Sequence, residues 1–296
     1  LMAQGLVGRG LVDFIASTAV AGNVGLHHTS KNARIICDWA GESAFPVYAG
    51  ATKPLLRELV TAEEVHGKTG LDGVALHEPR TPLQPAHAVA FLIDTLRHAE
   101  PGSITLCPIG PLTNIAQALA LAPDCARGIA RIVLMGGAYF EAGNITPAAE
   151  FNFYVDPHAA AMVLSSGVPI TVLPLDVTHK ACITTPRMNA LRQTGTENGA
   201  RLADILHSYE RYDTQKFGLE GGPLHDPCAI ACAVFPHLFG GKDCYVAVET
   251  QSELTMGASV VDWWGTTGKA PNVHWVTEVD ADALFDELRQ SMLQLP

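Results

Sequence analysis

The sequence has few charged residues and no long hydrophobic run, and both features narrow the classes of protein to which it can belong. Charged residues make up 17% of the chain and the net charge is -11. The composition therefore does not favour a positively charged surface that would bind nucleic acid or anionic lipid. No apolar run is long enough to span a bilayer, and no signal-peptide pattern opens the chain. We therefore expect a cytoplasmic protein with no nucleic-acid and no membrane partner.

Paired cysteines and phosphate-binding glycine motifs are also missing. The seven cysteines include no C-x-x-C pair, and reduced thiols are the default interpretation. Cys228 and Cys232 lie four residues apart, where a metal pair is conceivable but buried thiols fit better. No segment matches G-x-G-x-x-G or the P-loop pattern. A Rossmann-type dehydrogenase would suit the pattern of strands, but its glycine fingerprint is absent.

Short apolar runs alternate with helical patterns along most of the chain. The runs are nearly continuous, which is typical of buried parallel strands, and they lie at 14–20, 103–109, 131–137 and 169–177. The helical patterns end at glycine or proline in several cases and lie at 27–41, 86–99, 111–122 and 156–167. This alternation predicts an α/β fold in which helices flank a central, mostly parallel sheet.

The C-terminal part continues with further helices, a group of strands and a closing helix. The helices are predicted at 201–217 and 226–239, the strands at 243–251, 258–265 and 272–280, and the closing helix at 281–293. No internal repeat, low-complexity tract or linker interrupts the chain. We therefore expect a single domain over residues 1–296.

Polar residues and glycines follow several of the predicted strands. Asn23 follows the run at 14–20, the segment GPLTN follows the run at 103–109, and AYFEAGNITPAAEFN follows the run at 131–137. In open α/β sheets, ligands bind beyond the carboxyl ends of the strands. We therefore expect the functional site at this edge of the sheet.

The segment GNITPAAEFNFYVDP places Asn144, Glu150 and Asn152 within nine residues. Carboxylate and carboxamide groups gathered in this way suit a polyol such as ribose, whose hydroxyls need matched donors and acceptors. The alternative is an ordinary loop in which Asn144 supports a turn, and spacing alone does not decide between the two. For Asp156, at the end of the segment, the helix-capping interpretation is the better one.

The segment GGPLHDPCAIACAV raises a similar choice for His225 and Asp226. Asp226 could cap the following helix, with Pro227 at the first helical position, or it could bind a hard cation through its carboxylate. His225 could donate a proton to a leaving group, stack against it, or serve as a hydrogen-bonded structural histidine. His66 has the same alternatives, although the glycines around it in VHGKTGLDG favour close approach of the backbone to a ligand.

Taken together and in order, the motifs resemble the inosine-uridine-preferring nucleoside hydrolase family. They are STAVAGN, VHGKTGLDG, IGPLTNIA, IVLMGGA, GNITPAAEFNFYVDP, LDVTHKA and GGPLHDPCAIA. The resemblance extends from about residue 12 to the C-terminal strands and helix. VHGKTGLDG and PLHDPC are most similar to members that favour pyrimidine ribonucleosides. The resemblance implies hydrolysis of the N-glycosidic bond of a ribonucleoside to ribose and free base, with uridine or cytidine as the expected substrate and inosine as a further candidate.

The resemblance also implies a role for each candidate residue. Calcium would orient the ribose diol and a nucleophilic water, held by Asp226 and by the backbone carbonyl of Ile109. The residues expected to contact the substrate are Asn23, His66, Met135, Asn144, Glu150, Asn152, Tyr209, Tyr212, Asp213 and His225. Of these, His225 at the base and Asn152 at the sugar are the expected catalytic residues. Carboxylate and carboxamide oxygens would stabilise an oxocarbenium-like sugar, and a homodimer or homotetramer is the implied assembly.

One feature of the family is absent from this sequence. Members open with a strand that ends in an aspartate cluster, D-x-D-P-G-x-D-D, which supplies most calcium ligands, and no such cluster occurs here. Residue 1 falls within the helix expected after that cluster. Either the chain lacks an N-terminal segment of the natural protein, or it is a degenerate member; we favour the first, because the other site residues are retained. The alternative function is a catalytically inactive nucleoside- or ribose-binding protein.

Overall fold

The structure, a computed structural model, describes residues 1–41, 45–217 and 221–296, with the backbone alone described for 209–217. The strands are β1 (Ser17–Ala19), β2 (Val47–Ala49), β3 (Leu83–Gln84), β4 (Ile104–Leu106), β5 (Ile129–Met135), β6 (Ile170–Leu173), β7 (Phe239–Val248), β8 (Ser259–Asp262) and β9 (Val273–Val279). The α-helices are α1 (Met2–Gly8), α2 (Leu26–Ala40), α3 (Glu63–His66), α4 (Ala88–His98), α5 (Thr113–Leu121), α6 (Phe151–Val155), α7 (Pro157–Leu164), α8 (Leu175–Thr178), α9 (Thr185–Arg192), α10 (Glu197–Phe217), α11 (Asp226–Val234) and α12 (Ala281–Met292).

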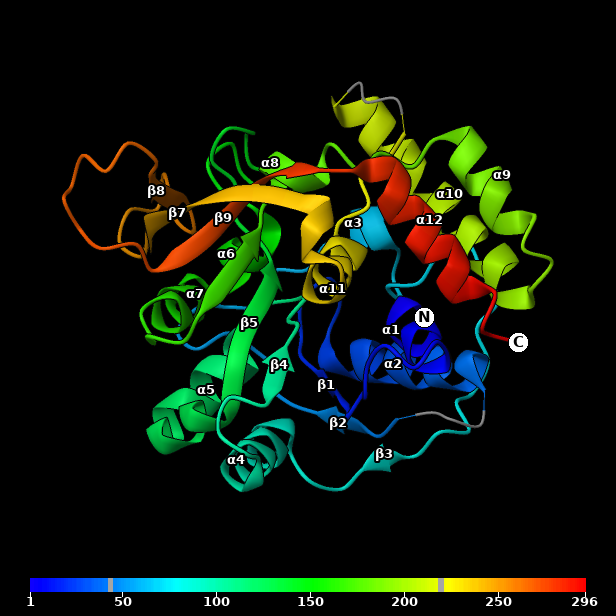
Figure 1. Cartoon of the computed structure of the whole chain (residues 1–296), viewed down its shortest axis with the longest axis horizontal. Helices are drawn as coiled ribbons and strands as arrows, with labels where there is room; N and C mark the ends of the chain where they lie inside the picture. Colours follow the sequence, from blue (N-terminus) through cyan, green and yellow to red (C-terminus); the bar gives the residue numbers. More distant parts are fainter. Residues whose placement is uncertain (42–44, 218–220) are drawn as a thin grey trace.

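The predicted fold class is confirmed, since helices flank mostly parallel strands (Figure 1). The strands form two hydrogen-bonded sheets, with the orders β1-β2-β3 and β4-β5-β6-β9-β7-β8. All pairs are parallel except those of β7, which runs antiparallel to both β8 and β9. None of the described helices is long and apolar enough to cross a membrane.

Strand β5 shows how the core is divided between the two faces of the larger sheet. Successive side chains of a strand point to opposite faces, so Ile132 and Leu134 pack in one hydrophobic cluster and Val133 and Met135 in the other. Burial on both faces explains why this strand reads as a continuous apolar run. Helices α5 and α7 cover the first face, and α11 packs on the second, where Cys228 and Cys232 are buried thiols, as predicted.

One predicted strand and one predicted helix end four and five residues earlier than expected, in both cases shortly before a proline. The strand predicted at 169–177 stops at Leu173, because Pro174 has no N–H to continue the ladder, and α8 begins at the next residue. The helix predicted at 226–239 stops at Val234, ahead of Pro236, and Phe239 already belongs to β7. The first of these differences matters for function, because α8 carries residues of the candidate site.

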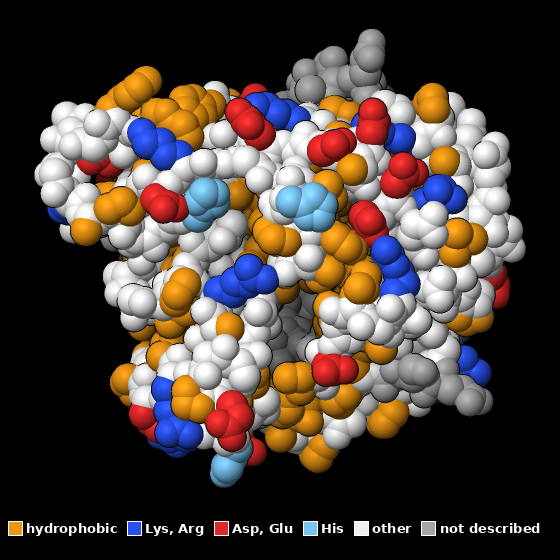
Figure 2. All heavy atoms as spheres, in the orientation of Figure 1, with side chains coloured by type: hydrophobic (Ala, Val, Ile, Leu, Met, Phe, Trp, Pro, Cys, Tyr) orange, Lys and Arg blue, Asp and Glu red, His pale blue; other side chains and the backbone are white. Residues whose placement is uncertain are grey.

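A buried amide ties the smaller sheet to helix α5. The side chain of Asn114, near the start of α5, accepts a hydrogen bond from Ala51 N at 2.8 Å and donates one to Ala19 O at 3.0 Å. These two backbone groups lie at the carboxyl ends of β2 and β1, so the amide ties the smaller sheet to the helix that follows β4. The face of the molecule that is turned to the viewer in Figure 2 is hollowed near its centre.

Asp156 links the start of α7 to the segment after β2 and to α5. Its carboxylate accepts from Ala159 N at 3.0 Å, which confirms the predicted cap of α7. It also accepts from Leu55 N at 2.9 Å and from Thr113 Oγ1 at 2.7 Å. A group predicted to act locally therefore also holds two distant segments in place.

We expect Asn114→Ala to lower the free energy of unfolding by roughly 2–4 kcal/mol, because it leaves one buried donor and one buried acceptor unpaired. Urea denaturation followed by circular dichroism measures this loss. Gln117→Ala is the matched control on the same helix, since no hydrogen bond of the Gln117 side chain is present among the described residues. A similar loss in both variants would contradict the bridging role of Asn114.

Candidate active site

The polar candidates gather beyond the carboxyl ends of β5 and β6, beside the start of α11. Asn152, in α6, donates a hydrogen bond from Nδ2 to the backbone oxygen of Met135 at 3.1 Å and lies 3.4 Å from Met135 Sδ. Met135 is the last residue of β5, so this contact fixes the carboxamide over the end of the strand. The Asn152 Oδ1 atom has no hydrogen-bond donor among the described residues and can accept one from a ligand.

Glu150 is held by backbone donors on two sides. Its Oε1 atom accepts from Asn152 N at 2.9 Å, and its Oε2 atom accepts from Gly137 N at 2.9 Å and Phe153 N at 3.2 Å. The residue is 2% exposed, and this burial raises the pKa of the carboxyl to about 7, although the three N–H groups favour its charged form. The negative charge of Asp226 raises it further, which places Asp226 within electrostatic reach of Glu150.

Asn144 supports the same loop from below α6, since its Oδ1 atom accepts a hydrogen bond from Phe151 N at 2.9 Å. This hydrogen bond supports the interpretation of Asn144 as a residue that stabilises the loop. Glu150 and Asn152, the other two residues of the motif, have different roles. Glu150 caps α6, and Asn152 keeps a free acceptor at the end of β5.

The capping interpretation of Asp226 is wrong. Asp226 is the first residue of α11, and the cap position falls on His225, whose backbone is already helical at φ -76° and ψ -73°. The Asp226 carboxylate accepts no hydrogen bond from any described residue, and burial raises its pKa to about 7. A buried carboxylate without a donor costs folding free energy. Because no described residue donates to Asp226, its carboxylate is available to a ligand.

His225 is bound on one side of its ring and surrounded by two further imidazoles. Its Nδ1 atom lies 2.8 Å from Thr178 Oγ1, and its ring centroid lies 5.9 Å from that of His179. Burial lowers the pKa of His225 to about 3, and His179 and His66 lower it further. Burial also lowers the pKa of His66, at the end of α3, to about 4. At neutral pH both His225 and His66 are therefore uncharged.

Asp176 fixes the loop after β5, which carries Glu141. Its Oδ1 atom accepts hydrogen bonds from the backbone N–H groups of Tyr139, Phe140 and Glu141 at 3.0, 2.9 and 2.9 Å. Its Oδ2 atom accepts from Trp275 Nε1 at 2.8 Å. The Glu141 carboxylate approaches His179 Nδ1 at 3.5 Å, so the anchored loop brings a negative charge to the histidines.

Sequence reasoning missed Asp176, Thr178 and His179, although all three lie in the LDVTHKA motif. Asp176 falls within the strand predicted at 169–177 and was therefore assigned to the sheet, whereas β6 ends at Leu173. For Thr178 and His179 the available signal was their position directly after that predicted strand.

The remaining candidates are less constrained by the described contacts. The side chain of Asn23 has no hydrogen bond among the described residues, while its backbone oxygen accepts from Ala62 N at 2.9 Å, just before α3. Ile109, beyond β4, has a side chain that is 43% exposed. Tyr209, Tyr212 and Asp213 lie on α10, but their side chains are outside the described part of the structure.

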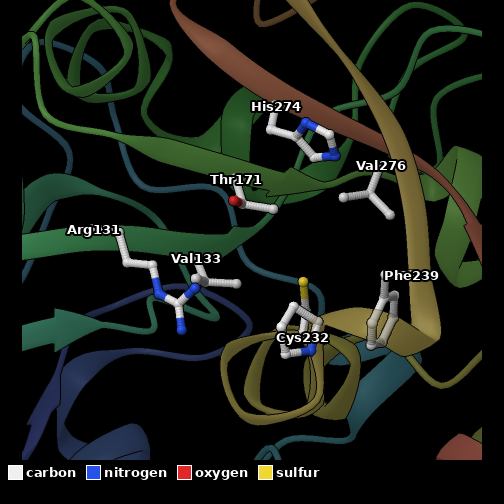
Figure 3. Close-up of a pocket in the computed structure, with 8 residues that line it drawn as sticks. Arg131, Val133, Thr171, Cys232, Phe239, His274 and Val276 are labelled. Atoms are coloured by element: carbon white, nitrogen blue, oxygen red, sulfur yellow. The ribbon is translucent and has the colours of Figure 1, made fainter.

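Two cavities lie away from this cluster. One of 80 Å³ is lined by Arg131, Thr171, Cys232 and His274, towards the amino-terminal half of β5 and β6 (Figure 3). It is smaller than the roughly 300–1,000 Å³ of typical ligand pockets, and Arg131 donates to Ala233 O at 2.7 Å, where it caps the end of α11. A second, more open cleft of 510 Å³ lies beside the end of β2 and contains none of the candidate residues. We place the candidate site at the cluster because Asn152 Oδ1 and the Asp226 carboxylate accept no hydrogen bond from the described residues.

The described residues do not make a calcium site on their own. No group of three or more histidine, cysteine, aspartate or glutamate side chains with metal-binding geometry occurs in the described part of the chain. Asp226 offers a free carboxylate and Ile109 a backbone carbonyl, whereas calcium takes six to eight oxygen ligands. The predicted ligands therefore account for only part of a calcium shell.

Comparisons with known proteins by family profile, by sequence and by structure all match nucleoside hydrolases. The profile of the family described as inosine-uridine preferring nucleoside hydrolase matches residues 2–286. A pyrimidine-specific ribonucleoside hydrolase RihA of Shewanella sp. (strain MR-7) is 46% identical over 281 residues, covering 94% of this chain and 87% of its own length. An uncharacterised protein of Schizosaccharomyces pombe is 47% identical over 285 residues, covering 96% and 92% of the two chains.

Solved structures with the same fold belong to ribonucleoside hydrolases. The purine-preferring ribonucleoside hydrolase from Gardnerella vaginalis superposes with a TM-score of 0.90 at 29% identity, over 99% of this chain and 93% of that one. A plant nucleoside hydrolase superposes with a TM-score of 0.88 at 28% identity, over 99% and 95% of the two chains. The similarity thus extends over nearly the whole chain.

We expect Asp226→Asn to stabilise the protein when calcium is absent. Folding raises the pKa of this carboxyl from 3.8 to about 7, so the folded state binds the proton more tightly and stability is lost as the pH rises between these values. The variant should therefore match the wild type near pH 3 and exceed it by roughly 2 kcal/mol at about pH 8, a value reduced for partial exposure of the side chain. Urea denaturation at the two pH values measures the difference.

Asp156→Asn is the matched control, because Asp156 also lies at the start of a helix but accepts three hydrogen bonds. It should destabilise the protein at about pH 8. If Asp226 is a calcium ligand, millimolar calcium raises the melting temperature of the wild type and not that of Asp226→Asn. An equal effect of calcium on both would count against Asp226 as a metal ligand.

Proposed function

Because this chain belongs to the inosine-uridine-preferring nucleoside hydrolase family, we propose that it hydrolyses the N-glycosidic bond of pyrimidine ribonucleosides, uridine and cytidine, with inosine as a further substrate. The pyrimidine assignment rests on relatives named pyrimidine-specific ribonucleoside hydrolase, 42–46% identical to the chain. The observation that carries the proposal is the convergence of three groups with free acceptor or donor atoms, Asn152, Asp226 and His225, beyond one edge of the larger sheet.

On the sugar side, the Asn152 Oδ1 atom and the Asp226 carboxylate are free to accept hydrogen bonds from ribose hydroxyls. Glu150 lies behind them and adds negative charge when ionised. Cleavage of the glycosidic bond develops positive charge on the sugar, and oxygen atoms fixed in a buried setting stabilise that charge more than water does. Asn23, next to α3, would complete the contacts to the sugar.

On the base side, His225 presents an uncharged imidazole. With its pKa lowered to about 3, the ring holds no surplus proton at neutral pH and acts as a hydrogen-bond donor to the base as charge develops there. His66 encloses the base from α3. Tyr209, Tyr212 and Asp213 of α10 are proposed for the same side.

The reaction balances without any further reactant. The bond between C1′ and the base nitrogen breaks, and its electron pair leaves with the base. Water adds its oxygen to C1′ and loses a proton, and the base gains one, which gives ribose and free base. Asp226 and Ile109 do not fill the coordination shell of calcium, so the roles above are those of the chain's own residues.

We expect the purified protein to release reducing sugar from uridine, and His225→Ala to lower kcat on uridine by about 10²–10⁴-fold. The loss should be small with 4-nitrophenyl riboside, because 4-nitrophenolate leaves without a proton. Reducing-sugar and absorbance assays measure the two rates. Near-normal turnover of uridine by the variant would exclude His225 from the base side.

A second candidate function, a nucleoside- or ribose-binding protein without turnover, is favoured by one observation, the incomplete set of calcium ligands in the described part of the chain. Equilibrium dialysis with radiolabelled uridine separates the two functions. Saturable binding with no release of uracil, in buffer with and without calcium, would favour the binding protein. Release of uracil would favour the hydrolase.

We further propose that the chain folds as one domain and works in the cytoplasm as a homodimer or homotetramer, as the family resemblance implies. The match of the family profile over residues 2–286 supports a single unit.

A further inference from the structure

We propose that Thr178 is a positioning residue that fixes the ring orientation and tautomer of His225, so that His225 presents its Nε2–H group to the leaving base. The proposal rests on the proposed function, which places His225 beside the base. It concerns a contact between residues 47 positions apart in the sequence, Thr178 Oγ1 and His225 Nδ1, which lie 2.8 Å from one another.

The Thr178 hydroxyl is held rigidly. The residue is fully buried, at 0% exposure, and is the last residue of α8. Its backbone N–H donates to Pro174 O at 3.1 Å, and its backbone oxygen accepts from Ala181 N at 3.1 Å. A β-branched side chain on a fixed backbone has few rotamers. The oxygen that contacts His225 is therefore located by the fold rather than by the ligand.

The buried hydroxyl also decides which ring nitrogen carries the proton. A neutral imidazole has one N–H donor and one acceptor nitrogen, and a hydroxyl can play either part. Among the described residues, His225 Nδ1 is the one hydrogen-bond partner of Thr178 Oγ1. If Nδ1 carried the proton, the hydroxyl hydrogen would be buried without an acceptor, which is costly. Donation from Thr178 to Nδ1 satisfies both atoms and places the ring proton on Nε2.

The other ring nitrogen is free to contact a substrate. His225 Nε2 has no hydrogen-bond partner in the described part of the chain, and the residue is partly exposed. A half-turn of the ring would exchange Nδ1 with a carbon and lose the bond to Thr178. The ring of His179, at 5.9 Å between centroids and 56° between planes, packs on the same histidine. Both contacts favour one orientation.

The first test is spectroscopic and does not depend on activity. We would label the histidines with ¹⁵N, record long-range nitrogen–proton spectra at neutral pH, and identify His225 by its loss in His225→Ala. The wild type and Thr178→Ser should show the Nε2–H tautomer. Thr178→Val, which keeps the shape of the side chain but removes the hydroxyl, should show a mixture or the Nδ1–H tautomer. An Nδ1–H signature in the wild type, or an unchanged tautomer in Thr178→Val, would overturn the proposal.

The second test compares two leaving groups. Thr178→Val should lower kcat on uridine by about 10–100-fold and change the rate with 4-nitrophenyl riboside by less than about two-fold, with little change in KM. Thr178→Ser should restore the uridine rate to within about three-fold. Equal losses on both substrates would mean that Thr178 has only a structural role.

Thr113→Val is the matched control for removal of a buried hydroxyl. Thr113 is 1% exposed and donates to Asp156, outside the candidate site. This variant should lower the melting temperature without separating the two substrates. If the wild type hydrolyses neither riboside, the proposed function fails, and the tautomer of His225 still decides the role of Thr178.

Discussion

The buried carboxylate of Asp176 is the interaction on which the arrangement of the site depends. Four donors satisfy it, three from the loop after β5 and one from Trp275 in β9. A buried carboxylate must be paired, and here the pairing ties two strands to the start of α8. The same short helix ends in Thr178 and is followed by His179, which contact His225 from across the fold. The hydrogen bonds that satisfy the Asp176 carboxylate therefore also fix α8, and α8 in turn places Thr178 and His179 beside His225.

Among the acidic groups in and around the candidate site, three are fully paired and one is not. Asp156, Asp176 and Glu150 accept three or four hydrogen bonds each and stabilise the loops around the carboxyl ends of the strands. Asp226 accepts none from the described residues and has a raised pKa. Such a group lowers stability unless a ligand satisfies it, and functional sites commonly retain this kind of local cost. The contrast separates the carboxylates that hold loops in place from Asp226, the one for which we propose a ligand.

Much of the fold could be predicted from the sequence because its strands are buried on both faces. Continuous apolar runs such as 131–137 are typical of strands covered by helices on both faces, and the observed β5 agrees. The errors arose at short elements. Helix α6 has five residues and α8 has four, so neither offers enough turns for a helical period to be recognised. Local sequence left a cap and a cation ligand open for Asp226, because the first residue of a helix is located from sequence only to within one or two positions.

Sequence patterns were enough to predict the fold class and the family, and they proposed candidate site residues that are close along the chain, namely the pairs Glu150–Asn152 and His225–Asp226. Periodicity and local spacing carry that information, since both depend on neighbours. Only the tertiary structure decided which distant groups meet. The contacts of Thr178 with His225 and of Asp176 with Trp275 join residues 47 and 99 positions apart. No local pattern encodes such pairs, because they follow from how strands and helices pack once the whole chain has folded.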